Sequence, residues 1–163
     1  MQQTEKNTVT TPQSGEISSG GIRYLLMRPD VLMGVAHELE GVTPEVFLKA
    51  LKKSAFHHGR RSFERYRDEG RFAGLDPLES TCNIAASLGW GEWVVHRQPH
   101  GNRLIEVRNS PFAAGFGASR IPVCAPIVGI LEAVTMVFQG PTAQVEEIAC
   151  CSQGADVCRF HLR

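Results

Sequence analysis

The sequence predicts an α+β domain in which helices pack on a small antiparallel sheet. Residues 43–66 place apolar side chains at every third or fourth position, which is typical of a long amphipathic helix. Near the carboxy-terminus, residues 142–150 and 156–162 are strand-like segments on either side of a Ser-Gln-Gly-Ala turn, the pattern of a β-hairpin. The chain has 163 residues, which is the size of one domain and enough to bury a core without disulfide bonds.

Capping residues mark the first two helices. Pro29 can begin a helix that Gly41 would end, since glycine readily takes the left-handed conformation found after a helix. Thr43 is a suitable N-cap for the long amphipathic helix, and Pro44 suits its first position. This helix should continue for about 25 residues.

The remaining elements follow from similar signals. A third helix is expected over residues 76–88, and a strongly apolar, buried helix over residues 122–138. Two strands are expected over residues 93–96 and 103–107. Residues 109–120 are rich in Gly, Ala and Ser and predict a loop.

The first 21 residues are predicted to form a disordered leader, because Thr, Ser, Gln and Gly dominate them. Order is expected to begin at Ile22, and residues 22–163 should form a single domain without repeats or linkers. No apolar run approaches the roughly 20 residues that span a bilayer, and no secretory signal precedes the domain. We therefore expect a cytoplasmic protein that does not associate with membranes.

Charge argues against direct nucleic-acid binding. The chain carries 17 basic and 17 acidic residues, whereas nucleic-acid-binding domains usually have a basic excess. In the cytoplasm the five cysteines would stay reduced, so their abundance needs an explanation other than disulfide bonds.

Cysteines are concentrated near the carboxy-terminus, where Cys124, Cys150 and Cys158 accompany Glu147. Thiolates and a carboxylate are suitable ligands for tetrahedral zinc, and a hairpin can bring the last three of these residues together. Strict strand alternation would put Glu147 and Cys150 on opposite faces, so the strand must end or bulge between them. Spacing alone leaves open that the cysteines are small buried hydrophobes, which is the interpretation adopted for Cys82.

A family resemblance bears on this choice. Residues 122–124, the apolar helix after them and the sequence VEEIACCSQGADVCRF over residues 145–160 resemble the vinyl-4-reductase domain family. Within that family they are most similar to the amino-terminal sensor domains of bacterial phenol- and toluene-responsive activators. The resemblance implies structural zinc held by Cys124, Glu147, Cys150 and Cys158, with Cys151 outside the ligand set.

The resemblance also implies a fold shared with TRAPP-type subunits, a ligand chamber between helices and sheet, and a homodimer. No segment resembles the ATPase or helix-turn-helix domains of the activators, so we expect a stand-alone domain that does not activate transcription by itself.

We predict an apolar cavity between the long helix, the buried helix and the strands. Gly59 and Gly129 lie in apolar stripes, where either a ligand or a second helix approaches closely. His57 and His58 are expected on a solvated helix face. The residues predicted to bind the ligand are Gly59, Phe63, Trp93, Leu104, Ile127 and Leu131.

The favoured function is binding of a small hydrophobic or aromatic molecule by a zinc-stabilised sensory or carrier domain. One alternative is a reductase or accessory protein of tetrapyrrole (bacteriochlorophyll) biosynthesis. That role needs a hydride source, and the sequence has no dinucleotide or flavin motif. The other alternative is an interaction scaffold without a ligand. No catalytic residue is assigned.

Overall fold

A four-stranded antiparallel sheet forms one layer of the protein, in the strand order β3-β4-β6-β5. The computed structural model describes residues 15–19, 21–141 and 144–163. The strands are β3 (Glu92–Arg97), β4 (Arg103–Arg108), β5 (Val145–Ala149) and β6 (Cys158–Leu162). Helices cover this sheet, so the predicted α+β class is confirmed.

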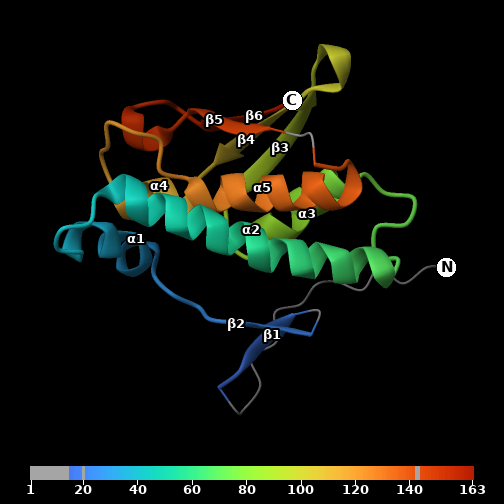
Figure 1. The fold of residues 1–163 in the computed structure, drawn as a ribbon, viewed down its shortest axis with the longest axis horizontal. Helices are drawn as coiled ribbons and strands as arrows, with labels where there is room; N and C mark the ends of the chain where they lie inside the picture. Colours follow the sequence, from blue (N-terminus) through green and yellow to red (C-terminus); the bar gives the residue numbers. More distant parts are fainter. Residues whose placement is uncertain (1–14, 20, 142–143) are drawn as a thin grey trace.

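Helix α5 (Ala125–Phe138) lies between the sheet and α2 (Pro44–Asp68), as Figure 1 shows. Because α5 is apolar on nearly all sides, it is stable only in such a central position. The long helix α2 has the 25 residues expected from its sequence, and it begins at Pro44 as predicted.

The two glycines of the apolar stripes allow α2 and α5 to approach closely. A Cβ atom at Gly59 would lie 2.7 Å from the Cδ1 atom of Ile130. A Cβ atom at Gly129 would collide with the backbone oxygen of Lys52 and lie 3.0 Å from the Ala55 Cβ atom. Tight helix packing, one of the two explanations considered for these glycines, therefore accounts for Gly129 and contributes at Gly59.

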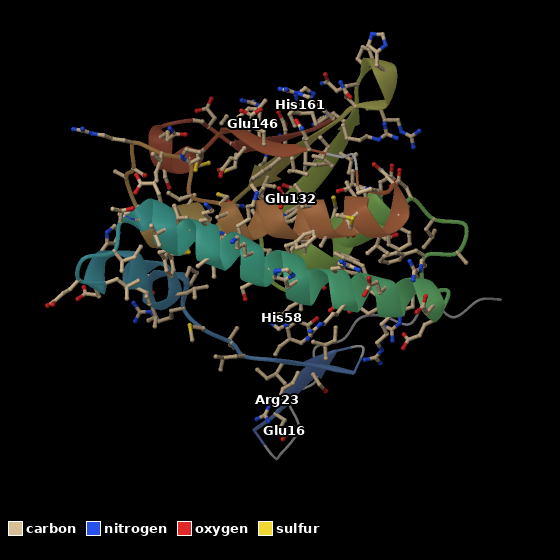
Figure 2. The ribbon with its side chains drawn as sticks, in the orientation of Figure 1. Glu16, Arg23, His58, Glu132, Glu146 and His161 are labelled. Atoms are coloured by element: carbon tan, nitrogen blue, oxygen red, sulfur yellow. The ribbon has the colours of Figure 1, made fainter. Side chains whose placement is uncertain are left out.

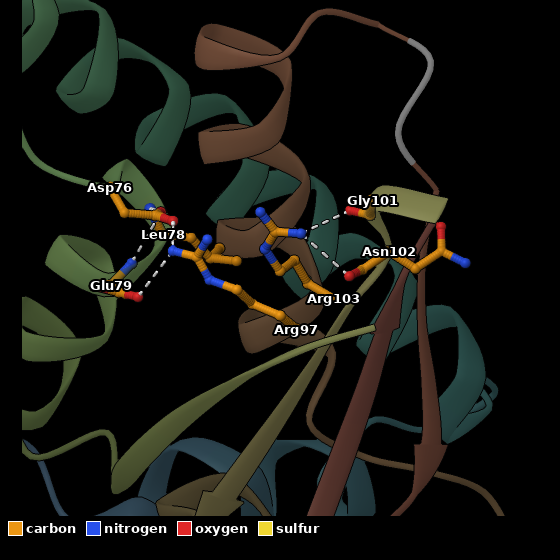
Figure 3. A network of polar contacts seen from close by, with 7 residues as sticks. All are labelled: Asp76, Leu78, Glu79, Arg97, Gly101, Asn102 and Arg103. Carbon is orange, nitrogen blue, oxygen red and sulfur yellow. Dashed lines mark hydrogen bonds and ion pairs between the residues drawn. The ribbon is translucent and has the colours of Figure 1, made fainter. Parts of the chain in front are cut away.

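Helix α3 (Pro77–Ser87) also packs against α5. It is capped by Asp76, whose carboxylate accepts a hydrogen bond of 2.8 Å from the Leu78 N–H. Arg97 of β3 lies 3.9 Å from the Asp76 carboxylate and 3.8 Å from that of Glu79 (Figure 3). The Arg97 side chain is 70% exposed, so these ion pairs orient the end of the strand but stabilise it little.

A short helix, α4 (Pro111–Phe116), occupies the segment predicted to be a loop. The prediction was wrong because it weighed the Gly, Ala and Ser content above two local signals. Ser110 is the N-cap, with a hydroxyl that accepts a hydrogen bond from the Ala113 N–H, and Pro111 suits the first turn. Phe112 and Phe116 are buried, which fixes the helix against the core.

The amino-terminal part differs from prediction in its boundary. Residues Ile17–Ser19 were assigned to the leader, yet they form β1 and pair with β2 (Ile22–Tyr24). Figure 1 shows this hairpin on the side of α2 opposite the four-stranded sheet. Helix α1 (Pro29–Glu38) follows it. Residues 1–14 of the predicted leader and residues 142–143 of a predicted strand lie outside the described residues.

Candidate metal centre and apolar cavity

The four residues predicted to bind zinc come together in the folded chain. Each of Cys124, Glu147, Cys150 and Cys158 offers one ligand atom, and these atoms all lie within 4.8 Å of one another. The Cys124 Sγ atom is 3.6 Å from the Cys158 Sγ atom and 3.9 Å from the Cys150 Sγ atom. All three thiols are completely buried and none forms a disulfide.

Helix α5 and the β5–β6 hairpin position this cluster. Cys124 is the N-cap of α5, and its backbone N–H donates a hydrogen bond of 2.9 Å to Glu147 Oε2. The pairing of β5 with β6 shifts register between Glu147 and Ala149, and β5 ends at Ala149. The expected interruption of the strand before Cys150 is thereby confirmed, and it lets Glu147 and Cys150 face the same cluster.

The turn between the two strands supports the thiols. The Cys151 N–H donates to the Cys158 Sγ atom at 3.3 Å, while the Cys151 side chain stays outside the ligand group. Gly154 has a φ of 92°, which ends the short 3-10 turn η2 (Cys151–Gln153) in the left-handed conformation. From the α4 side, the Ser110 hydroxyl lies 3.2 Å from the Cys124 Sγ atom.

The electrostatics of the cluster are compatible with a bound cation. Glu147 Oε1 is buried without a hydrogen-bond partner, although a buried carboxylate oxygen normally has one. Burial raises the pKa of Glu147 to about 8. Hydrogen bonds to Cys150 and Cys158, together with burial, raise the pKa of Cys124 far above its usual range, and the Cys124 hydrogen bond lowers that of Cys150. Without a metal, the cluster therefore retains protons among closely spaced sulfur and oxygen atoms.

Three sulfur ligands and one carboxylate oxygen match the coordination preferences of zinc, and the partnerless Glu147 oxygen fits a ligand role. The fifth cysteine is not part of this site. Cys82 is buried in α3, and burial raises its pKa to about 12, so it is an inert core thiol.

An apolar cavity of about 360 Å³ lies beside α2, in the size range of small-molecule sites. Its walls come from α2, from α3 and the turn after it, from the first part of α5 and from β2, with single side chains from α1 and α4. Trp90 and Phe112 form one aromatic part of the wall, with ring centroids 4.9 Å apart and an edge-on orientation. The lining residues are Ile22, Tyr24, Leu32, Leu51, Ser54, Ala55, His58, Gly59, Ser62, Phe63, Tyr66, Thr81, Ile84, Ala85, Leu88, Trp90, Phe112, Pro126 and Ile130.

Two of the six residues predicted to bind a ligand, Gly59 and Phe63, line this cavity. The other four lie elsewhere. Ile127 and Leu131 are completely buried in the core, one position along α5 from the lining residues Pro126 and Ile130, and each position turns the helix by about 100°. Trp93 is buried on β3 and Leu104 is half-buried on β4, away from the lining.

Helix α3 was predicted from the sequence, but the strand region near Trp93 and Leu104, not α3, was expected in the cavity wall. The spacing of Ile84 and Leu88, four positions apart after a capped start, is the signal that could have placed α3 there. Trp90 rather than Trp93 reaches the cavity, and the Trp93 indole N–H donates to the Trp90 carbonyl at 3.0 Å.

Comparison with known proteins supports the predicted resemblance. Residues 104–163 match the family model of the vinyl-4-reductase domain. No curated protein matches the chain. Within the part of the chain that the structure describes, no helix is long and apolar enough to cross a bilayer.

Solved structures show the same fold. The phenol-responsive sensory domain of the transcription activator PoxR, solved with phenol, superposes with a TM-score of 0.76 and 21% identity over 92% of this chain and 81% of that one. A vinyl-4-reductase family protein from Methanocaldococcus jannaschii has a TM-score of 0.53 and 18% identity, over 82% of this chain and 74% of that one.

A third similar structure is subunit 3 of the trafficking protein particle (TRAPP) complex from Naegleria fowleri, covalently bound to palmitic acid. It has a TM-score of 0.54 and 13% identity, over 83% of this chain and 93% of that one. The predicted resemblance to vinyl-4-reductase domains and the predicted TRAPP-like fold are both confirmed.

Proposed function

We propose that this chain is a zinc-stabilised domain that binds a small hydrophobic or aromatic molecule, in a sensory or carrier role. The observation that carries the proposal is the apolar cavity of about 360 Å³. Helix α5 lines part of this cavity, and the N-cap of α5, Cys124, belongs to the cysteine cluster. Pro126 lines the cavity and lies two positions after Cys124.

In this proposal zinc is bound by Cys124, Glu147, Cys150 and Cys158 and has a structural role. Four protein ligands leave no open position for a catalytic water. Bound zinc would fasten the start of α5 to the β5–β6 hairpin and neutralise the buried carboxylate. A cytoplasmic setting, which is part of the proposal, keeps the thiols reduced and available.

The cavity lining supports a mainly apolar ligand. Most of its residues are aliphatic or aromatic, and the polar ones are hydroxyl groups and a single imidazole. The sensory domain of PoxR is described as phenol-responsive and was solved with phenol. The TRAPP subunit was solved covalently bound to palmitic acid, so both similar structures contain a molecule with an aromatic or aliphatic body.

A neutral fluorescent probe, N-phenyl-1-naphthylamine, tests the proposal. We expect saturable binding of one probe per chain, with fluorescence enhanced by the apolar surroundings. Ile84→Trp should abolish binding because the larger side chain fills the cavity from α3. Ile148→Trp, at a position on β5 that is 50% exposed and outside the lining, is the matched control and should bind normally. Absence of saturable binding to the wild-type chain would contradict the proposal.

We further propose that the functional form is a homodimer. Large apolar side chains are exposed next to one another along the chain, in the segment after β2 and on one face of α1. They are Leu25, Leu26, Met27, Val31, Val35 and Leu39. A second copy would cover this surface. Sedimentation should show a dimer that Val31→Asp with Val35→Asp converts to a monomer, and a monomeric wild-type chain at high concentration would contradict the proposal.

A further inference from the structure

The wall that α2 contributes to the cavity has a polar edge. Ser54, His58 and Ser62 follow one another at intervals of four positions, so they form one line along the helix, and all three line the cavity. Ser54 and His58 are exposed, whereas Thr81 and Phe112 of the same cavity are buried. The cavity therefore has a polar, solvent-facing mouth and a buried interior.

Figure 2 shows His58 on the side of α2 that faces β2, the strand that contributes Ile22 and Tyr24 to the lining. The mouth thus lies between α2 and the amino-terminal hairpin. Of these residues, His58 offers a ring N–H that can donate a hydrogen bond at the mouth.

A permanent positive charge lies next to this mouth, on Arg61. Arg61 lies three positions after His58, so the two side chains are neighbours on the helix surface. Among the described residues, neither the His58 ring nor the Arg61 guanidinium has a hydrogen-bond or ion-pair partner, in contrast to Arg60 and Arg65, which pair with Glu64 and Glu69. None of the described residues lining the cavity is acidic.

We propose that the cavity takes an amphipathic anion, with its apolar body among the interior side chains and a single carboxylate at the mouth beside His58 and Arg61. This inference rests on the proposed small-molecule function and names the chemical class of the ligand. A carboxylate at an exposed mouth keeps part of its hydration, and hydrogen bonds to cationic donors are stronger than those between neutral groups. The same carboxylate in the buried interior would lose its hydration without a cationic partner.

Tyr24, which also lines the cavity, does not repel this ligand. Burial, together with the neighbouring Tyr66, raises the pKa of Tyr24 to about 12, so its hydroxyl remains neutral at physiological pH. A neutral phenol can donate a hydrogen bond to an anion and does not repel it.

Displacement of N-phenyl-1-naphthylamine by decanoate and by 1-decanol tests the inference, because the two probes have the same chain length and differ in the charge of the head group. At about pH 7.5, where a carboxylic acid is ionised, we expect decanoate to bind at least about tenfold more tightly than decanol. The double substitution His58→Gln with Arg61→Gln should remove this preference, because it should weaken decanoate binding by about tenfold and change decanol binding by much less. The matched control is Lys53→Gln with His57→Gln, which changes two exposed basic residues of α2 outside the lining and should keep the preference.

The outcomes separate the two proposals. Equal affinity for decanoate and decanol, or a preference that survives in the His58 and Arg61 variant, overturns the inference while probe binding still supports the small-molecule function. Failure of all three compounds to bind overturns both. If the double variant folds poorly, salt supplies the second test. Raising ionic strength from about 0.05 M to about 0.5 M should weaken decanoate binding and not decanol binding, and an equal response of both would contradict the inference.

Discussion

Glu147 uses its two carboxylate oxygens differently, and this asymmetry is the most informative detail of the cluster. Oε2 accepts the Cys124 N–H at the start of α5, so it satisfies a helix terminus. Oε1 is buried and has no partner, although it lies among three thiols. A cation bound as proposed would account for both the partnerless oxygen and the convergence of the sulfur atoms.

Substitution of one thiol tests the metal ligands individually. Cys150→Ser should abolish stoichiometric zinc binding and lower the free energy of unfolding by about 3 kcal/mol or more, because structural zinc contributes directly to folding. Cys82→Ser is the matched control, since it replaces another buried cysteine, and it should leave the zinc content unchanged. Elemental analysis and chemical denaturation measure the two quantities. Unchanged zinc content in Cys150→Ser would contradict the assignment.

Zinc binding should also depend on pH in a definite direction. The raised pKa values of Cys124 and Glu147 mean that the metal-free cluster holds protons that zinc must displace. Lower pH favours the protonated form, so apparent zinc affinity should fall as pH falls, about tenfold per pH unit for each proton released. Titration against a chelating indicator at several pH values measures this slope. An affinity independent of pH between about 6 and 8 would be inconsistent with thiol ligation.

At the residue scale, the sequence predicted the cluster better than the cavity. The convergence of four candidate ligands could be predicted because a hairpin and a helix start allow few arrangements. The irregularity before Cys150 followed from strand alternation. The cavity depends on which way a helix is rotated. Ile127 and Leu131 were expected where Pro126 and Ile130 lie, since an apolar helix gives no polar face to fix its rotation.

At the element scale, the contact between α2 and α5 limits what either helix can tolerate. The neighbour of Gly129 is backbone of α2, which cannot move aside, whereas the nearest neighbour of Gly59 is the end of the Ile130 side chain. The two positions therefore differ in the cost of adding a methyl group.

Alanine substitutions measure that difference. Gly129→Ala should lower the free energy of unfolding by about 1–3 kcal/mol, and Gly59→Ala should lower it less. The control is Gly34→Ala in the middle of α1, where nothing lies within 4 Å of the added Cβ atom. It should raise stability by about 0.5–1 kcal/mol through helix propensity alone. Denaturant titration compares the three variants, and equal effects at Gly129 and Gly34 would contradict the packing described for α5.

The long helix and the carboxy-terminal hairpin were predictable because capping residues and hydrophobic periodicity agree in both. Helix α4 was not predicted, because a helix of six residues is too short to show periodicity and only its cap marks it. The pairing of β1 with β2 was missed for a related reason, since strands of three residues leave little pattern in a sequence dominated by Ser and Gly.

At the scale of the whole molecule, the cysteine cluster and the cavity are linked through one helix. Cys124 is the N-cap of α5, and Pro126 and Ile130 of α5 line the cavity. In the proposal, loss of the metal would leave the Glu147 carboxyl buried without its cation. Only the hydrogen bond from the Cys124 N–H to Glu147 would then hold the helix start to β5 in this cluster. A loosened α5 makes a poorer cavity wall.

Removal of zinc should therefore weaken ligand binding without any ligand touching the metal. We expect a strong chelator to lower the affinity for N-phenyl-1-naphthylamine by about fivefold or more, and added zinc to restore it, since couplings of this kind are typically about 1–3 kcal/mol. Fluorescence titration before and after chelation measures the change. Identical affinities for the metal-free and metal-loaded chain would mean that the cluster and the cavity are independent.

Native mass spectrometry of the chain prepared with zinc and N-phenyl-1-naphthylamine tests the central claim most directly, because it counts both partners on the same molecule. The account predicts a dominant species in which each chain carries one zinc ion and one probe molecule, with the probe absent from the Ile84→Trp chain. A chain that carries the probe equally well without zinc would contradict the coupling, and one that carries neither would contradict a zinc-stabilised binding domain altogether.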